Sequence, residues 1–499
     1  MTNYIAYDFE TSGRNARFDQ ILQAGIIVYN KNFQVIEKLN LKSRINPDIV
    51  PSINALRVNK LKVSDILSEP ISYYEMTLKM QRFLSKFSNS FFVGFNSINF
   101  DEEFFRQMLW EHFNFPYITN TNGNSRLDIL NLVTMIHAFR KNSIKVEKND
   151  EGKITFKLES LARANSFASE NAHEAIADVE TTMKLLEVLL KKNADIFRTF
   201  VDNSYPKNLE KKIIEDDIFT LHNYMFNSHR IYLVKHLVKH PTYTNQLLGF
   251  DLKYDTSEIT NLAIEDLHEV FRTKSYFRKI KLNKQPSILD KSFSRNQIPY
   301  SEFSDDEIKL KCQQLNNIDF QKKIIKILEK ESVDYNQNQS QELQREEQTI
   351  YSHKINYNDS IIMNRFHNEE WDKKWSFAEK FKDQRLRFFA ARHIYRNFPE
   401  ELPKKIFIFL HQKIAERICS LGKEKFTTIP AAMEEADTLS LEIEENNLGK
   451  DLKEQIDQYN IYINFLNDYY SNSNPQPIRF DSSLSSKFFG NTRRKNVEY

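Results

Sequence analysis

The segment Tyr4-Ile5-Ala6-Tyr7-Asp8-Phe9-Glu10-Thr11-Ser12-Gly13 predicts the first strand of the fold. Its apolar and aromatic residues are typical of a strand, and the run ends in residues that form turns. Because side chains two positions apart on a strand project from the same face, the carboxylates of Asp8 and Glu10 are expected to point the same way. Acidic residues also flank ordinary exposed strand ends, so this pair becomes informative only together with other segments.

Two further acidic residues belong to other predicted elements. Asp101 comes soon after the apolar segment 91–96, and Asp178 lies near the start of a helix predicted over 175–192. The apolar residues of that helix recur at helical spacing, at Ile176, Val179, Met183 and Leu186. The step from His173 to Asp178 would turn a regular helix by about 140°, so His173 is expected in the loop before the helix.

The residue types predict a metal-dependent nuclease site. Four hard carboxylates favour Mg²⁺ or Mn²⁺, whereas Zn²⁺ would be expected to recruit more histidine or cysteine. Two such ions, about 4 Å apart, can activate a water, hold a phosphorus in line and stabilise the leaving 3′ oxygen. His173 is then the candidate general base, since its unperturbed pKa is near neutral. Taken alone, His173 would more often be an ordinary loop histidine with its hydrogen bonds satisfied.

With these segments in chain order, the first 195 residues resemble the DEDD exonuclease family, in its His-x4-Asp branch. Besides residues 8–13, the resemblance is carried by segments 124–128, 158–165 and 172–178, and segment 395–399 resembles part of the helical domain of related chains. It implies an α/β RNase H-like exonuclease domain that removes nucleotides from 3′ ends. The implied catalytic residues are Asp8, Glu10, Asp101, His173 and Asp178. The four carboxylates among them are the implied ligands of two Mg²⁺ ions, for which Mn²⁺ can substitute.

The chain length of 499 residues is expected to hold about three domains. Residues 1–195 alternate strand-like and helix-like segments, as expected for the exonuclease domain. Residues 196–345 contain short β-like runs and helices, and the resemblance implies an SH3-like α+β domain. Residues 346–475 have a helical pattern, and residues 476–499 are predicted to be a disordered basic tail. The polar stretch 334–342 is expected to be an exposed linker.

Composition limits the function classes. The sum of Lys and Arg is 70 and that of Asp and Glu is 68, so any field that attracts nucleic acid must be local. The two cysteines, Cys312 and Cys419, make neither a disulfide framework nor a zinc site and favour a reducing cytoplasm. The sequence shows no signal peptide and no apolar run of membrane-spanning length, so we expect a cytoplasmic monomer without a membrane partner. Most of the 39 Phe and 22 Tyr are expected in the core.

Substrate and partner contacts are predicted outside the acidic set. Glu10, Thr11 and Arg126 are expected to bind substrate; the alternative for Arg126 is an ion pair with Asp128 or Glu159. Two basic clusters either contact phosphates or lie on solvated surfaces: Arg385, Arg387, Arg392 and Arg396, and Arg278, Lys279, Lys281 and Lys284. Related chains bind the acidic C-terminal tail of single-stranded DNA-binding protein through their SH3-like region, and Arg295 is the candidate for that contact here.

The chain departs from the family in one segment. Where relatives carry Pro-x-Pro followed by Thr-Gly-Ile, this chain has Pro51-Ser52-Ile53-Asn54-Ala55 and later Asn59-Lys60-Leu61. The resemblance places this segment near the terminal nucleotide, so the departure concerns how that nucleotide is held.

The leading hypothesis is a processive 3′–5′ exonuclease that degrades single-stranded DNA to nucleoside 5′-monophosphates during DNA repair and recombination. One alternative is an RNA 3′-end-trimming exonuclease, because discrimination depends on how the site treats a 2′-hydroxyl. RNA-trimming relatives are usually short, single-domain chains, so the roughly 300 residues beyond the nuclease domain count against this alternative. The other is an inactive nuclease fold kept as a DNA-binding scaffold, which the complete set of acidic residues disfavours.

Overall fold

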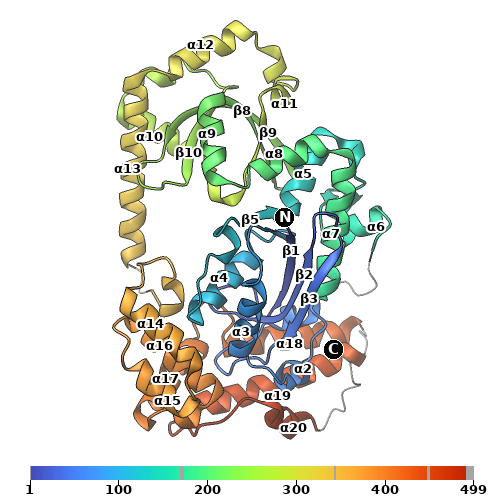
Figure 1. The fold of residues 1–499 in the computed structure, drawn as a ribbon, viewed down its shortest axis with the longest axis vertical. Helices are drawn as coiled ribbons and strands as arrows, with labels where there is room; N and C mark the ends of the chain where they lie inside the picture. Colours follow the sequence, from blue (N-terminus) through green and yellow to red (C-terminus); the bar gives the residue numbers. More distant parts are fainter. Residues whose placement is uncertain (1, 169–173, 342–343, 447–449, 491–499) are drawn as a thin grey trace.

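A five-stranded mixed sheet forms the centre of the N-terminal part of the computed structural model, which describes residues 2–168, 174–341, 344–446 and 450–490 (Figure 1). The strand order is β3-β2-β1-β4-β5. The strands are β1 (Tyr4–Thr11), β2 (Ile21–Tyr29), β3 (Val35–Lys42), β4 (Phe91–Gly94) and β5 (Ser125–Asp128). Strand β2 is antiparallel to both β1 and β3, whereas β4 runs parallel to β1 and β5 runs parallel to β4.

Helices cover both faces of this sheet. Ile5, Tyr7 and Phe9 of β1 share a core with α3 (Tyr73–Leu84) and α4 (Asp101–Glu111). Ala6 faces the opposite core, which contains apolar residues of α5 (Ile129–Phe139) and α7 (Ala175–Lys192). Further elements of this region include α6 (Leu158–Ala164), α8 (Ala194–Asp202), β6 (Glu147–Lys148) and β7 (Ile154–Thr155). The prediction of alternating strands and helices is confirmed, and the helix predicted over 175–192 has those bounds.

The middle region contains a second five-stranded sheet, in which all neighbours are antiparallel and the order is β11-β10-β9-β8-β12. Its strands are β8 (Ile218–Met225), β9 (Ser228–Lys239), β10 (Gln246–Asp251), β11 (Phe277–Lys281) and β12 (Ser287–Asp290). Its helices are α9 (Pro206–Asp216), α10 (Ile264–Thr273), α11 (Ser292–Arg295), α12 (Asp305–Leu315) and α13 (Ile318–Gln341). The predicted mixture of short strands and helices in this region is confirmed.

The expected linker is mostly helical. Helix α13 continues to Gln341 and extends from the middle region toward the C-terminal helices (Figure 1). Its first half buries Phe320, Ile324 and Leu328 in the core of the middle region. Once this apolar face has nucleated the helix, propagation adds one hydrogen bond per residue, so a polar continuation stays helical. Residues 334–337 are exposed as predicted for the linker, and they belong to the helix.

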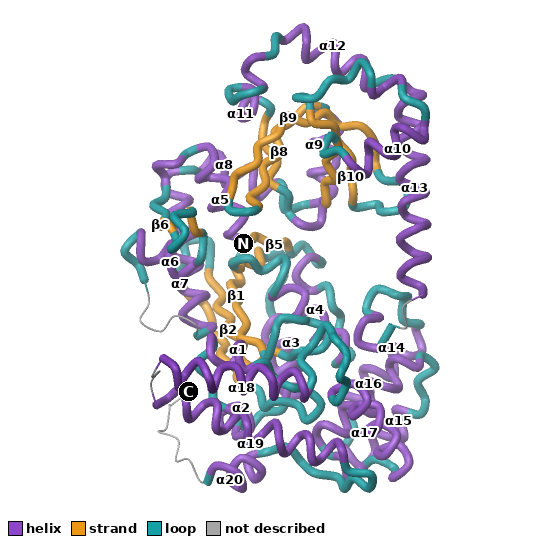
Figure 2. Tube along the Cα trace, turned by 180° about the vertical axis from the view of Figure 1, so that it is seen from behind, coloured by secondary structure: helices purple, strands orange, loops and turns teal. Residues whose placement is uncertain are grey.

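The C-terminal region is helical, as predicted. It contains α14 (Tyr357–Asn368), α15 (Trp371–Ala378), α16 (Gln384–Asn397), α17 (Lys404–Ile418), α18 (Ile429–Asn446), α19 (Lys450–Ser471) and α20 (Ser482–Phe489). Its core includes residues of the short helices α1 (Ile53–Val58) and α2 (Val63–Ser68), which lie beside α18 and α19 (Figure 2). The nuclease region and the helical region therefore share one core.

Part of the expected disordered tail is ordered. Phe480 and Leu484 are buried, and the Ser485 hydroxyl donates to the carbonyl of Ser64 in α2 at 3.2 Å. These apolar side chains anchor α20 against the nuclease region although the surrounding sequence is polar. The prediction of disorder is wrong for residues 482–489, and residues 491–499 lie outside the described part of the chain.

The arginines of α16 bind protein groups. Arg396 pairs with Asp48 at 2.7 Å, and Arg392 pairs with Glu111 at 2.8 Å. Burial raises the pKa of Asp48, but Arg396 and neighbouring arginines outweigh burial and hold that pKa below its usual value. The other two arginines bind Asp383 and the carbonyls of residues 349, 379 and 381. All four arginines of this predicted basic cluster thus bind groups of the protein itself, and no phosphate is needed to explain their positions.

None of the described helices is both long enough and apolar enough to cross a membrane.

Candidate active site

Strand β1 presents two carboxylates toward helix α7. Asp8 and Glu10 alternate with Tyr7 and Phe9, which pack into the opposite core. Asp8, Glu10 and Asp178 each offer a carboxylate oxygen, and these oxygens lie within 4.8 Å of one another. The predicted convergence of these three residues is confirmed.

A glycine in β2 allows this convergence. Gly25 lies opposite Asp8 in the antiparallel register. A Cβ added at Gly25 would lie 2.6 Å from the carbonyl carbon of Ala175 and 2.7 Å from the nitrogen of Ile176. The first turn of α7 therefore packs directly on the backbone of β2, which brings Asp178 to the strand that carries Asp8. The sequence reasoning missed Gly25, although a glycine inside a predicted strand often marks such a close approach.

The fourth predicted carboxylate, Asp101, lies at the start of α4. It is buried, and its Oδ1 accepts a hydrogen bond from the backbone N–H of Phe9 at 3.0 Å. This bond fixes Asp101 against the strand position between Asp8 and Glu10. Asp101 is close enough for its charge to raise the pKa of Asp8, but it lies outside the group of three oxygens within 4.8 Å, so its role as a metal ligand stays a prediction.

The acidic set is electrostatically costly without a cation. Burial raises the pKa of Glu10 to about 8, and the charge of Asp178 adds to this. Burial also raises the pKa of Asp101 to about 8. The pKa of Asp8 is raised well above its usual value by burial and by the charges of Asp101, Glu10 and Asp178. Oxygen ligands that repel one another at this spacing form a suitable site for a hard divalent metal ion.

His173 falls in residues 169–173, which lie outside the described part of the chain. Its predicted role as general base therefore stays a prediction.

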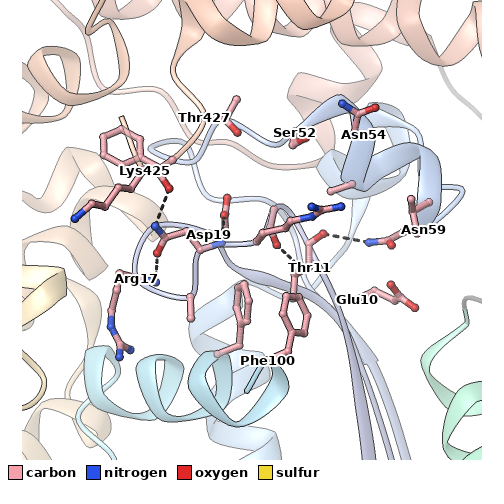
Figure 3. A pocket seen from close by; sticks show the side chains of 18 of the residues that line it. Glu10, Thr11, Arg17, Asp19, Ser52, Asn54, Asn59, Phe100, Lys425 and Thr427 are labelled. Atoms are coloured by element: carbon pink, nitrogen blue, oxygen red, sulfur yellow. Dashed lines mark hydrogen bonds between the residues drawn. The ribbon is translucent and has the colours of Figure 1, made fainter. Parts of the chain in front are cut away.

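A large groove begins at this set. Its volume is about 1480 Å³, and its lining includes Glu10, Thr11, Asn54, Asn59 and Phe100 (Figure 3). The departing segment lies in its wall, because Ser52, Asn54, Ala55 and Asn59 all line the groove.

Residues of the helical region form another part of the groove wall. The Asn15 side-chain amide donates to the carbonyl of Lys425 at 2.7 Å (Figure 3). The rings of Phe18 and Phe426 lie 4.5 Å apart. Lys425 and Thr427 thereby reach the groove from a segment more than 400 residues away from β1. Sequence reasoning missed this wall, because no local pattern in segment 424–431 indicates what it packs against.

Arg126 lies in a buried ion pair rather than at the groove. Its guanidinium donates to Glu102 at 3.1 Å and to the carbonyl of Asn283 at 2.8 Å. The partner is thus neither Asp128 nor Glu159, and Arg126 is 7% exposed. These contacts count against the predicted substrate contact of Arg126 and indicate that it joins the nuclease region to the middle region.

Arg295 also binds groups within the middle region. Its guanidinium donates to the carbonyls of Tyr300 and Phe303 and pairs with Asp305 at 2.9 Å. Its side chain keeps 23% exposure. The contacts indicate that Arg295 shapes the turn before α12, which weakens its assignment as the anchor for an acidic partner.

The second basic cluster is divided among different contacts. Arg278 pairs with Asp251 at 2.8 Å, and Lys279 lies 3.8 Å from Glu331. Lys284 donates to the carbonyl of Ile98 at 3.0 Å and pairs with Glu103 of the nuclease region. The cluster is therefore not a single phosphate-binding patch.

Residues 5–186 match the family described as Exonuclease. Over 295 residues the chain is 30% identical to Exodeoxyribonuclease I of Haemophilus influenzae, which covers 57% of this chain and 60% of that protein. It is 25% identical to Exodeoxyribonuclease I of Escherichia coli, over 54% of this chain and 58% of that protein. The sequence matches thus span about three fifths of the length of these relatives. The matches confirm the predicted resemblance to an exonuclease family and show that the chain is similar to bacterial exodeoxyribonuclease I.

Solved structures extend the likeness in fold to almost the whole chain. Exonuclease I of Methylocaldum szegediense superposes with a TM-score of 0.80 at 20% identity, covering 93% of this chain and 100% of that one. Escherichia coli Exonuclease I in complex with a dA16 oligonucleotide gives a TM-score of 0.77 at 19% identity, with the same coverage. The mixed α/β exonuclease domain and the helical C-terminal region thus share the fold of these proteins.

Proposed function

We propose that this chain is a 3′–5′ exonuclease that degrades single-stranded DNA processively to nucleoside 5′-monophosphates. The observation that carries the proposal is the meeting of Asp8, Glu10 and Asp178 within 4.8 Å at a large groove. The exonuclease match over residues 5–186 and the exodeoxyribonuclease I relatives support it. A role in DNA repair and recombination, in the cytoplasm and as a monomer, is part of the same proposal.

Asp8, Glu10, Asp101 and Asp178 would hold two Mg²⁺ ions. When bound, such ions supply charge stabilisation for the attacking and leaving oxygens of a phosphodiester. His173 would accept the proton of the attacking water, since an imidazole titrates near neutral pH. The backbone N–H of Phe9 holds Asp101 in place, and Gly25 lets α7 place Asp178. Glu10 and Thr11, which line the groove, would contact the terminal nucleotide.

The arrangement of the three regions supports processivity. Helix α13 runs from the middle region toward the helical region, and the nuclease region contacts both. A strand lying in the groove would be enclosed by these parts, so it would leave slowly between cleavage steps. We assign residues 1–195, 196–345 and 346–475 to the exonuclease, SH3-like and helical domains; the resemblance supports the SH3-like assignment, and the described elements support the other two.

An acidic peptide is the proposed protein partner, in the form of the C-terminal tail of single-stranded DNA-binding protein. The support is the resemblance of the middle region to that of related chains. Fluorescence titration of a labelled acidic peptide tests it directly. Binding that weakens with salt is expected, and an Arg295→Ala variant that binds as wild type does would move the anchor elsewhere.

The decisive test of the activity uses 3′-end assays on matched substrates. Single-stranded DNA, duplex DNA and RNA, each labelled at the 5′ end, are incubated with the protein and Mg²⁺, and the products are sized. Progressive shortening of single-stranded DNA is expected. Preferential shortening of RNA would replace the proposal by RNA 3′-end trimming, and binding without cleavage of any substrate would indicate a scaffold.

A further inference from the structure

Four basic side chains line the groove: Arg14, Arg17, Arg57 and Lys425. Arg17 is occupied, because it donates to Gln107 at 2.8 Å and to Glu103 at 3.0 Å. Lys425 also has an interaction within the protein. Arg14 and Arg57 differ from both. They are exposed, and their side chains make no hydrogen bond, ion pair or ring contact with any described residue.

Hydrogen bonds hold the backbone near these two arginines in place, although their side chains bind no described residue. Arg57 lies on α1, whose start is joined to the turn after β1 by a bond from the Ser52 N–H to the Ser12 carbonyl at 2.8 Å. At the other end of α1, the Asn59 amide donates to the Thr11 carbonyl at 3.1 Å. Both arginines therefore stand close in the fold to the end of β1, where Glu10 is located.

The turn that carries Arg14 closes on a carboxylate. Asp19 accepts from the Asn15 N–H at 2.8 Å and from the Ser12 hydroxyl at 3.3 Å. A Cβ at Gly13 would lie 2.4 Å from the Asp19 carboxylate, so glycine is needed for this closure. The backbone of Arg14 is thus held in place while its guanidinium remains available.

The groove otherwise suits a polyanion poorly. Its lining includes the carboxylates of Glu10, Asp19, Glu103, Glu424 and Glu435. The metal ions of the proposed site would neutralise the phosphate that is cleaved, but not the phosphates that follow it in the strand. Guanidinium groups that have no protein partner are suited to bind these phosphates through charge-assisted hydrogen bonds.

We propose that Arg14 and Arg57 bind internucleotide phosphates next to the 3′ end of the strand, from two separate elements of the groove wall. The inference rests on the proposed function, because it needs a nucleic acid strand in the groove. It explains how this chain holds its substrate where segment 51–61 departs from the pattern of its relatives.

The test measures binding of a labelled single-stranded oligonucleotide over a range of salt, with Ca²⁺ replacing Mg²⁺ and the strand checked for integrity. Arg14→Ala and Arg57→Ala are each expected to weaken binding about tenfold at low salt, the scale for losing a charge-assisted hydrogen bond. Each should also reduce the slope of log K against log salt by about 0.7, the share of one phosphate contact on a single strand. Arg198→Ala in α8 is the matched control, since Arg198 is also exposed but does not line the groove.

A series of oligonucleotides, each with a single methylphosphonate at a different internucleotide position near the 3′ end, locates the phosphates that are contacted. At the position that an arginine contacts, the neutral linkage should weaken binding by the wild-type protein. With that oligonucleotide, replacing the arginine by alanine should weaken binding no further. This inference would be overturned if both arginine variants showed the same slope of log K against log salt as the wild-type protein. If the wild-type protein still degraded single-stranded DNA, the proposed function would stand. A wild-type protein that neither binds nor degrades single-stranded DNA would overturn both.

Discussion

Replacing Gly25 by alanine tests how helix α7 positions the active site. The new Cβ would lie 2.6 Å from the Ala175 carbonyl carbon, whereas ordinary contacts begin near 3.4 Å. The start of α7 must therefore move by about 0.8 Å, and Asp178 moves with it. A misplacement of about 1 Å in a catalytic constellation can cost about 10²-fold in rate, which is about 2.7 kcal/mol. Overpacking of this kind also destabilises a fold by about 1–3 kcal/mol.

Single-turnover cleavage of single-stranded DNA with Mg²⁺, together with thermal unfolding, separates the two effects. Gly249→Ala is the matched control, because Gly249 lies inside β10 of the other sheet and its added Cβ would meet Val234 at 2.3 Å. We expect both variants to lose stability but only Gly25→Ala to lose about 10²-fold in rate. Wild-type cleavage by Gly25→Ala, or an equal loss in both variants, would refute the proposed positioning by α7.

Three further outcomes are expected. Asp8→Ala or Asp178→Ala should abolish cleavage without unfolding the protein, and activity within about tenfold of wild type would contradict the assignment of metal ligands. His173→Ala should lower turnover by about 10²- to 10⁴-fold with little change in substrate affinity, and an unchanged rate at pH 7 would make His173 an ordinary loop residue. Burial and the charge of His229 lower the pKa of His222 to about 3, below its unfolded value near 6.5, so the unfolding free energy should fall as pH drops from about 6.5 toward 3. His222→Phe should reduce this dependence in urea titrations; an identical pH profile would show that His222 does not contribute to it.

The basic residues show where sequence patterns mislead. Arg392 and Arg396 belong to a basic cluster for which the sequence left open phosphate contact or a solvated surface, yet they pair with Glu111 and Asp48 of the nuclease region. Arg126 likewise pairs with Glu102. The partner of an arginine is set by which carboxylate lies nearest in space, and the spacing of charges along the chain does not contain that information. Arg14 and Arg57 stood out only once the contacts of the other basic residues in the groove wall were known.

Local sequence patterns were enough to predict the strand that carries Asp8 and Glu10, the helix that carries Asp178, and the hard oxygen chemistry of a divalent-metal site. These features are local, because period-two and helical patterns follow from backbone geometry and metal preference follows from ligand type. The tertiary structure alone decided how closely α7 approaches β2 at Gly25, which segment of the helical region lines the groove, and that segments 334–341 and 482–489 are helical. Each of these depends on packing between residues far apart in the chain, where buried contacts outweigh local propensity and are not encoded in any single segment.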